Sequence, residues 1–269
     1  SWRGISAGLP DQSLVSDLAS GPEGDLWVST DGDGVFRLSA GGEIWEKTSA
    51  GLPADADLNS LAVHGQRLVV GTFRKGVFYS EDYGKTWRSP VFNVPKVSVR
   101  TLLFLSDEYV LAGTDNGLYF SANGGKAWTL RQSSAQINDL YLRGETLYIA
   151  RADGLFASLD MGVTTTSEEV SFAIDEVFAN DEHLFVLPVG GDIYRRPLVG
   201  MVWEKPTQRT LGCMEVDNNL PSAVWSTFSR HRRMRPSFRP VPGGAYRYGF
   251  RRLLETKDAW VAAVLPLGC

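Results

Sequence analysis

The chain has 269 residues, of which 43% are hydrophobic and 22% are charged, and its formal net charge is −4. This hydrophobic content can fill a core, yet no apolar run reaches the roughly eighteen residues of a membrane-spanning helix. The 28 glycines and 13 prolines are typical of many short strands joined by tight turns. The length fits one repetitive all-β domain or two ordinary domains, and an uninterrupted repeat favours one.

The repeat is marked by a tryptophan-bearing turn that recurs about every forty residues. Successive markers are separated by 43, 42, 41, 37 and 38 residues. The positions are Trp2, Trp45, Trp87, Trp128, Thr165 (where one tryptophan is missing) and Trp203. Strand-like segments inside a step of this size indicate radial repetition of a small sheet. We therefore predict an all-β protein, a β-propeller of five to seven four-stranded blades that is incomplete at the C-terminus.

Taken in chain order, the first expected strand of each repeat carries an apolar pair with polar residues between its members. Val15 and Leu18, for example, flank Ser16 and Asp17. The innermost strand of a propeller lines the central channel, where polar side chains can meet water. The polar residues at these positions are Ser16, Asp17, Asn59, Arg100, Asn138, Asp139, Asp175 and Glu176.

The second expected strand is a short apolar run, such as Leu68-Val69-Val70. Runs of this length, bounded by turns, are typical of strands buried on both faces. A glycine then opens the third strand, as Gly76 does before Val77-Phe78, because glycine readily takes the positive φ that a tight turn requires.

A marked turn follows the third strand. Residues 80–87 read SEDYGKTW, and residues 121–128 read SANGGKAW, with Asn in place of Asp. Asp and Ser side chains can bond backbone amides within such a turn, glycine takes the left-handed conformation, and we expect the indole to cover the hairpin. We interpret this turn as structural rather than catalytic. Its predicted residues are Ser80, Asp82, Gly84, Trp87, Ser121, Asn123, Gly125 and Trp128.

The repeats divide the single expected domain into three parts. Residues 1–10 resemble a fourth strand that would complete the last blade, residues 14–207 give five clear blades, and residues 208–269 give a degenerate sixth blade and a partial seventh. Closing the ring in this way would remove exposed sheet edges. The closing blade lacks a third strand, and the chain starts without Met or a signal peptide, so we expect a fragment or a processed product.

The two cysteines, Cys213 and Cys269, fit no metal or redox spacing, and either one disulfide or a reduced pair is compatible with the sequence. The compartment stays open, with an extracytoplasmic location favoured.

The marked turns at 80–87 and 121–128 resemble the Asp-box, or bacterial neuraminidase repeat, whose pattern is S-x-D-x-G-x-T-W. Residues 1–207 are thus similar to the Asp-box propellers, a superfamily that includes sialidases, sortilin-type receptors and photosystem II assembly factors. The resemblance implies the propeller fold and is almost uninformative about activity.

A sialidase would require three arginines that clamp the substrate carboxylate, a tyrosine–glutamate nucleophile pair and an aspartate. The resemblance also implies an F-R-I-P motif near the start. Residues 195–197 (RRP) and 238–240 (FRP) match it poorly and come late. We therefore expect a non-enzymatic propeller with a scaffold, assembly or receptor-like role, and keep a sialidase-like glycoside hydrolase as the alternative.

The loops between the second and third strands are the expected binding elements, because they converge on one face of a propeller. Their mixed charge and single aromatic ring suit a protein, a polar ligand or a carbohydrate. The candidate residues are Asp31, Asp33, Phe73, Arg74, Asp115, Asn116, Arg151 and Asp153. The segment 31–34 (DGDG) resembles the start of a calcium loop but lacks the later ligands, so we expect neither a metal nor a cofactor.

A second candidate surface is a run of basic residues near the C-terminus. Eight arginines and no acidic residue lie between Arg230 and Arg252, which gives this stretch a charge of +8. Because the net charge is −4, the rest of the chain carries −12. Five of these, Arg230, Arg232, Arg233, Arg235 and Arg239, could dock an anionic partner. Nucleic acid is disfavoured because the body is acidic and the pI is about 5.5.

Overall fold

The computed structural model describes residues 5–11, 13–190, 193–205, 248–255 and 260–266. In the last two ranges the strands and their pairing are described. Several predicted features lie outside the described residues: Trp2, most of the degenerate blades, the arginines between positions 230 and 239, and both cysteines.

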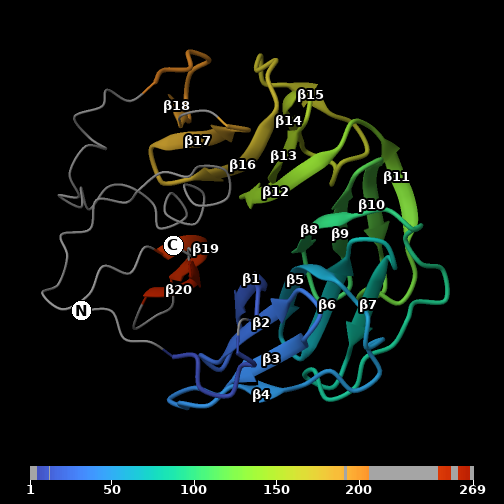
Figure 1. Cartoon of the computed structure of the whole chain (residues 1–269). Coiled ribbons are helices and arrows are strands. Elements are labelled where there is room, and N and C mark those ends of the chain that lie inside the picture. Colours follow the sequence, from blue (N-terminus) through green and yellow to red (C-terminus); the bar gives the residue numbers. More distant parts are fainter. Residues whose placement is uncertain (1–4, 12, 191–192, 206–247, 256–259, 267–269) are drawn as a thin grey trace, which may run out of the picture.

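Antiparallel sheets are arranged around a common centre, with the first strand of each sheet nearest to it (Figure 1). Strands follow one another in chain order within each sheet, and we refer to the first five sheets as blades 1 to 5. Blades 1, 3 and 4 have four strands: β1 (Val15–Ser20), β2 (Leu26–Thr30), β3 (Gly34–Leu38) and β4 (Glu46–Lys47); β8 (Val99–Phe104), β9 (Val110–Thr114), β10 (Gly117–Ser121) and β11 (Thr129–Ser133); β12 (Ile137–Arg143), β13 (Thr146–Arg151), β14 (Gly154–Ser158) and β15 (Thr166–Ser167).

Blades 2 and 5 have three strands instead of the expected four. Their strands are β5 (Leu58–His64), β6 (Arg67–Thr72) and β7 (Val77–Ser80); β16 (Ile174–Ala179), β17 (His183–Pro188) and β18 (Tyr194–Pro197). The fourth strand is reduced to single bridges, between Tyr79 and Arg88 and between Arg195 and Glu204. In blade 2, Pro90 follows closely and has no backbone N–H with which to extend the ladder.

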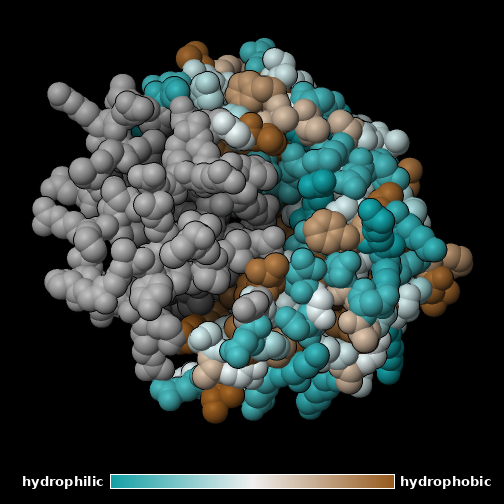
Figure 2. Space-filling model, in the orientation of Figure 1, coloured by the Kyte–Doolittle hydropathy of each residue, from teal (hydrophilic) through white to brown (hydrophobic). Residues whose placement is uncertain are grey.

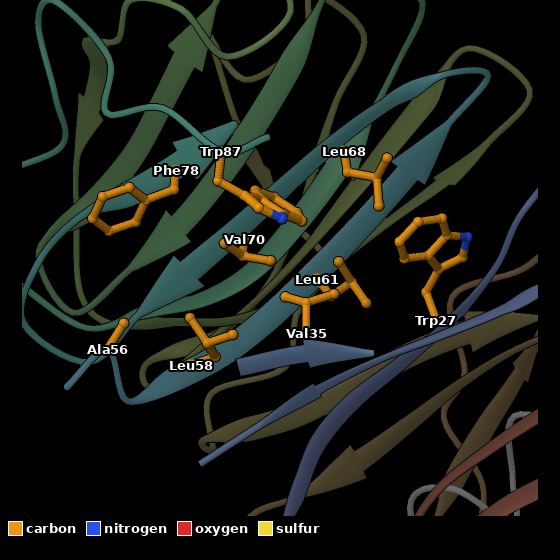
Figure 3. Packing of buried hydrophobic residues seen from close by; sticks show 9 residues of the cluster. All are labelled: Trp27, Val35, Ala56, Leu58, Leu61, Leu68, Val70, Phe78 and Trp87. Atoms are coloured by element: carbon orange, nitrogen blue, oxygen red, sulfur yellow. The ribbon is translucent and has the colours of Figure 1, made fainter. Parts of the chain in front are cut away.

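The second strands are buried on both faces, as predicted. Every residue of β2 and β9 is buried, because neighbouring blades cover both of their faces. The core between blades 1 and 2 brings Trp27 and Val35 against Leu61 and Leu68, and three of these four side chains have no exposed surface (Figure 3).

Trp87 belongs to the same cluster and is 3% exposed. Its indole Nε1 donates a hydrogen bond to the carbonyl oxygen of Thr48, at the end of blade 1, with a donor–acceptor distance of 2.7 Å. The ring therefore lies in the core between blades 1 and 2 and also bonds the preceding blade. That the indole covers its own hairpin stays a prediction. Gly84 also packs closely against blade 1, since a Cβ at this position would lie 2.6 Å from the Trp27 ring.

Each first strand contains a β-bulge at one equivalent position. The pairing shifts between Val15 and Asp17 in β1, and the other blades repeat this shift. The residues that the strand register skips at the bulges are Ser16, Asn59, Arg100, Asn138 and Asp175. A bulge re-aims a side chain and increases the local twist. Five of the eight polar positions that the sequence assigns to the channel are therefore bulged, whereas Asp17, Asp139 and Glu176 have partners in the register.

A further hairpin, β19 (Tyr248–Glu255) paired with β20 (Trp260–Pro266), lies beside β1 (Figure 1). Its register shifts between Phe250 and Arg252, in the same way as the first strands of blades 1 to 5. The described residues thus give five sheets and one hairpin, and they do not close the ring.

Candidate ligand-binding face

The two ends of the third strands define two faces of the molecule. One end receives the loops that come from the second strands, such as residues 73–76 before β7, and we call this the loop face. The other end leads into the marked turns, such as residues 80–87 after β7, and we call this the turn face. The two faces are opposite because the loop and the turn lie at opposite ends of one strand.

On the turn face, the Ser and the Asp or Asn side chains of the marked turns bond within their own turn, while Glu81 and Lys126 pair across two turns. The Ser80 hydroxyl accepts a hydrogen bond from the Gly84 amide at 2.9 Å, and Asp82 accepts from the Thr86 amide at 2.8 Å and from the Thr86 hydroxyl at 2.5 Å. Ser121 and Asn123 make the equivalent backbone contacts in blade 3, and Ser158 and Asp160 make them in blade 4.

These bonds change the acidity of the carboxyl groups. Burial acts to raise the pKa of Asp82, but hydrogen bonds from Thr86 and Ser80 outweigh it and lower the pKa to about 2. Hydrogen bonds from Thr164 and Ser158 lower the pKa of Asp160 to about 2 as well. Both groups are therefore engaged as ionised acceptors inside the turn, and little of their bonding capacity is left for a ligand.

The loop face of blades 1 and 2, by comparison, carries exposed charged side chains. Asp31 and Asp57 face each other in an isolated bridge and are both exposed. Phe73 lies beside them, because its amide donates a hydrogen bond to the Asp57 carbonyl oxygen. Its side chain is 44% exposed. Arg74 is exposed and forms no ion pair with the described residues.

Two other loop residues of these blades are held by neighbours. Asp33 accepts a hydrogen bond from the Ser13 hydroxyl at 2.6 Å, and Lys75 pairs with Asp55. Asp31, Asp33, Phe73 and Arg74 thus lie on the loops of blades 1 and 2, and their role in binding stays a prediction.

The loop face of blades 3 and 4 carries the other four candidates. Asp153 pairs with Arg151 through two hydrogen bonds of 2.8 and 2.6 Å. The Arg151 side chain is 11% exposed and its guanidinium lies 3.9 Å from the centre of the Phe156 ring. Arg151 therefore stabilises its own loop and offers little surface to a ligand. Asp115 and Asn116 are exposed, and Asn116 accepts from the Thr114 hydroxyl.

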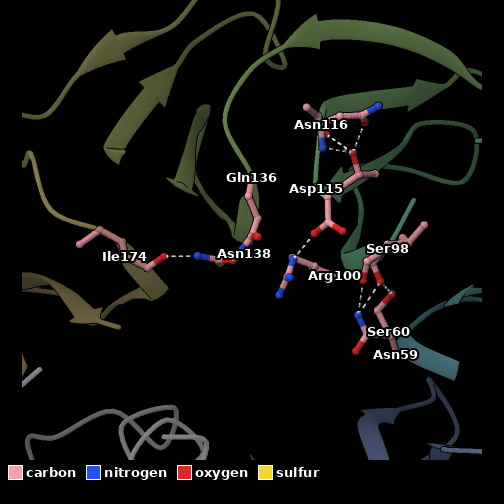
Figure 4. A network of polar contacts seen from close by, with 12 residues as sticks. Asn59, Ser60, Ser98, Arg100, Asp115, Asn116, Gln136, Asn138 and Ile174 are labelled. Carbon is pink, nitrogen blue, oxygen red and sulfur yellow. Dashed lines mark hydrogen bonds and ion pairs between the residues drawn. The ribbon is translucent and has the colours of Figure 1, made fainter. Parts of the chain in front are cut away.

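A belt of polar side chains at the inner strands joins these loops, and sequence reasoning did not single it out as a site. Arg100 donates through Nε to Asp115 at 2.6 Å, which connects β8 to the loop after β9 (Figure 4). On one side, Asn59 donates to the Val99 carbonyl oxygen at 3.0 Å. On the other, Gln136 donates to Asn138 at 2.6 Å, and Asn138 donates to the Ile174 carbonyl oxygen at 2.7 Å.

The space-filling view of the side seen in Figure 1 is hydrophilic over most of the described residues, with apolar side chains in separate spots (Figure 2). Within the described part of the chain, no cluster of His, Cys, Asp and Glu suited to a metal ion occurs. Nor does any helix in that part have the length and apolar character needed to cross a membrane.

Comparison with known proteins assigns the fold. The sequence matches no protein-family model and no curated protein. Among solved structures, YCF48 bound to D1 peptide has a TM-score of 0.59 at 17% identity, over 74% of this chain and 68% of that chain. The GH74 enzyme of Niastella koreensis has a TM-score of 0.56 at 19% identity, over 72% of this chain and 30% of that chain. The WD40 β-propeller domain of Doa1 has a TM-score of 0.55 at 16% identity, over 72% of this chain and 68% of that chain.

This chain is thus an all-β protein with the β-propeller fold. It spans 30% of the length of the Niastella enzyme. One similar structure is named as an enzyme and the other two are not. The fold therefore does not determine the activity, which has to be argued from the site.

Proposed function

We propose that the protein is a non-enzymatic propeller that binds a protein or peptide partner on its loop face. The observation that carries the proposal is the contrast between the two faces. The Ser and the Asp or Asn side chains of the marked turns bond inside their turns, as Asp82 does, whereas Phe73 and Arg74 are exposed on the loop face.

An exposed aromatic ring next to an arginine is the combination enriched at the energetic centres of protein interfaces. Exposed carboxylates on the same loops, Asp31 and Asp57, add groups that can discriminate between partners by charge. A propeller of the same fold, YCF48, has been solved with D1 peptide bound, which supports a peptide or protein as the kind of ligand for this chain.

The test is affinity capture from the native source followed by mass spectrometry, with paired variants. Phe73→Ala combined with Arg74→Ala should abolish recovery of the specific partner while the thermal midpoint stays close to that of the parent. Lys85→Ala, an exposed cation of the turn face, is the matched control and should retain the partner. Equal recovery by all three proteins would refute binding on the loop face.

A further inference from the structure

Arg100 is the cation among the bulged residues of blades 1 to 5. The residue that the strand register skips at each inner-strand bulge is Ser16 in blade 1, Asn59 in blade 2, Arg100 in blade 3, Asn138 in blade 4 and Asp175 in blade 5. The hairpin of β19 and β20 repeats the bulge and has Arg251 at the equivalent position. A bulge turns its extra residue out of the regular alternation, and bulges are common beside functional sites.

The guanidinium of Arg100 is only partly engaged. Its Nε donates to Asp115 at 2.6 Å, and the two side chains are 35% and 41% exposed. No described residue accepts from Nη1 or Nη2, and the far end of the guanidinium is directed away from Asp115 toward the middle of the ring (Figure 4). The edge formed by the two Nη atoms can match both oxygens of a carboxylate, as the Nε–Nη2 edge of Arg151 does with Asp153.

Side-chain amides flank this edge and are themselves fixed in place. Asn59 is bound to the Ser98 hydroxyl and to the Val99 carbonyl oxygen, at 3.3 and 3.0 Å. Asn138 is held between Gln136 and the Ile174 carbonyl oxygen and is 5% exposed. Both N–H groups of Asn59 are engaged in these bonds, which leaves its Oδ1 as an acceptor. The amide nitrogens of Gln136 and Asn138 each carry a second N–H beside the bond they donate.

The nearest acid on the following inner strand is occupied by structural bonds. Asp139 accepts from the Thr101 hydroxyl at 3.5 Å and from the Val177 amide at 3.1 Å, and it thereby joins three blades. The ligand group that best complements Arg100 and its neighbours is consequently an acceptor with two oxygens.

We propose that Arg100 binds a peptide carboxylate at the centre of the loop face, with Asn59 and Gln136 bonding the adjacent peptide groups. This inference rests on the proposed function, since it names the chemical group that the loop-face partner presents. Arg100 and its amide neighbours would hold an extended peptide end at the axis, while Phe73 and Arg74 contact more of the partner at the outer loops.

The experiment is a titration of the full chain, labelled with nitrogen-15, in which the Nε–Hε signal of Arg100 is followed by NMR. Three probes are compared: N-acetyl-trialanine with a free carboxylate, the same peptide as its C-terminal amide, and the N-acetyl-Ala-Glu-Ala amide. We expect a saturable shift with the first or the third probe and none with the neutral amide. The first two probes report a terminal carboxylate, and the third reports a side-chain carboxylate. Equal responses to the charged and neutral probes, or no response, would overturn the proposal.

Variants separate binding from stability. Arg100→Gln should remove the protein's response to the carboxylate probe, measured by the backbone amide signals of Asn138 and Asp115, and Arg100→Lys should weaken binding about tenfold because it keeps the charge and loses the fork. Arg88→Gln, which changes an exposed arginine outside the belt, should bind as the parent does. A response that persists in Arg100→Gln would assign Arg100 a structural role only. If the probe binds at Arg100 but the Phe73→Ala, Arg74→Ala protein still captures the partner, the proposed function fails and the carboxylate site stands. If the probe does not bind at Arg100 but the double variant loses the partner, the carboxylate site alone is rejected.

Discussion

The indole of Trp87 donates a hydrogen bond to the Thr48 carbonyl oxygen across the boundary between blades 1 and 2, with the two atoms 2.7 Å apart. The Trp87 amide also donates to the Ala50 carbonyl oxygen at 2.8 Å, and Trp45 and Trp128 repeat that amide bond with Ala7 and Phe92. The recurring tryptophan thus connects blades 1, 2 and 3 to the stretch of chain that precedes each of them.

Trp87→Ala should lower the free energy of unfolding by about 3–5 kcal/mol, because it removes a large buried ring and leaves the Thr48 carbonyl oxygen without this donor. Urea unfolding followed by circular dichroism measures the change. Ile44→Ala is the control, since Ile44 is 64% exposed and its replacement should change stability by less than about 0.5 kcal/mol. A loss for Trp87→Ala as small as that of the control would show that the indole does not join the blades.

Acid should weaken the marked turns of blades 2 and 4 selectively. The pKa values of Asp82 and Asp160 in the folded protein are about 2, below the ordinary 3.8, so these groups stabilise the protein above pH 3.8 and lose that contribution as pH falls toward 2. The double variant Asp82→Asn, Asp160→Asn keeps the acceptor oxygen, as Asn123 does naturally in blade 3, and cannot titrate.

Stability of the parent should therefore fall more steeply than that of the double variant over this acid range, as measured by thermal midpoints at a series of pH values. Parallel curves for the two proteins would contradict the assigned pKa values.

Alkali should act on Tyr83. Burial first, and then the hydrogen bond to Asp25, raise the pKa of the Tyr83 hydroxyl to about 12. Because this pKa is higher in the folded than in the unfolded protein, the contribution is complete below pH 10 and is lost as pH rises from 10 toward 12. Tyr83→Phe should abolish this part of the alkaline loss.

The same substitution should also cost about 1–3 kcal/mol at neutral pH, since Asp25 is fully buried and loses a donor while it keeps Arg37 at 2.9 Å. Tyr79→Phe is a suitable comparison, because Tyr79 lies in the same blade and its side chain is half-buried. Identical alkaline unfolding of the parent and Tyr83→Phe would argue against the bond to Asp25.

Much of the fold follows from the sequence because the repeat places equivalent residues at equivalent points. The apolar run 68–70 predicts the buried strand β6, and the glycine at position 76 predicts the turn before β7, where its φ is 72°. The hydrogen bonds within the turn at 80–87 also follow from residue type, since short polar side chains next to a left-handed glycine bond nearby amides.

The belt of polar side chains at the inner strands could not be predicted in the same way. Sequence identifies Arg100 and Asn138 as polar residues of inner strands, but the bulges at which they lie depend on how each first strand pairs with the second. Likewise, nothing in the sequence around Arg151 shows that its guanidinium would pack on Phe156 and pair with Asp153. Strand pairing within a blade decides both cases. The register of β8 against β9 and of β12 against β13 sets the bulges, and the hairpin of β13 with β14 brings Arg151 onto Phe156.

The most direct test of loop-face binding is site-specific photo-cross-linking in the native source. A photoreactive phenylalanine analogue replaces Phe73 on the loop face in one protein and Leu159 on the turn face in another. Leu159, at 77% exposed, is the more accessible position, compared with 44% for Phe73, so accessibility alone favours the turn-face site. We predict that the specific partner is cross-linked from position 73 and not from position 159. Cross-linking of that partner from position 159 alone would contradict the account.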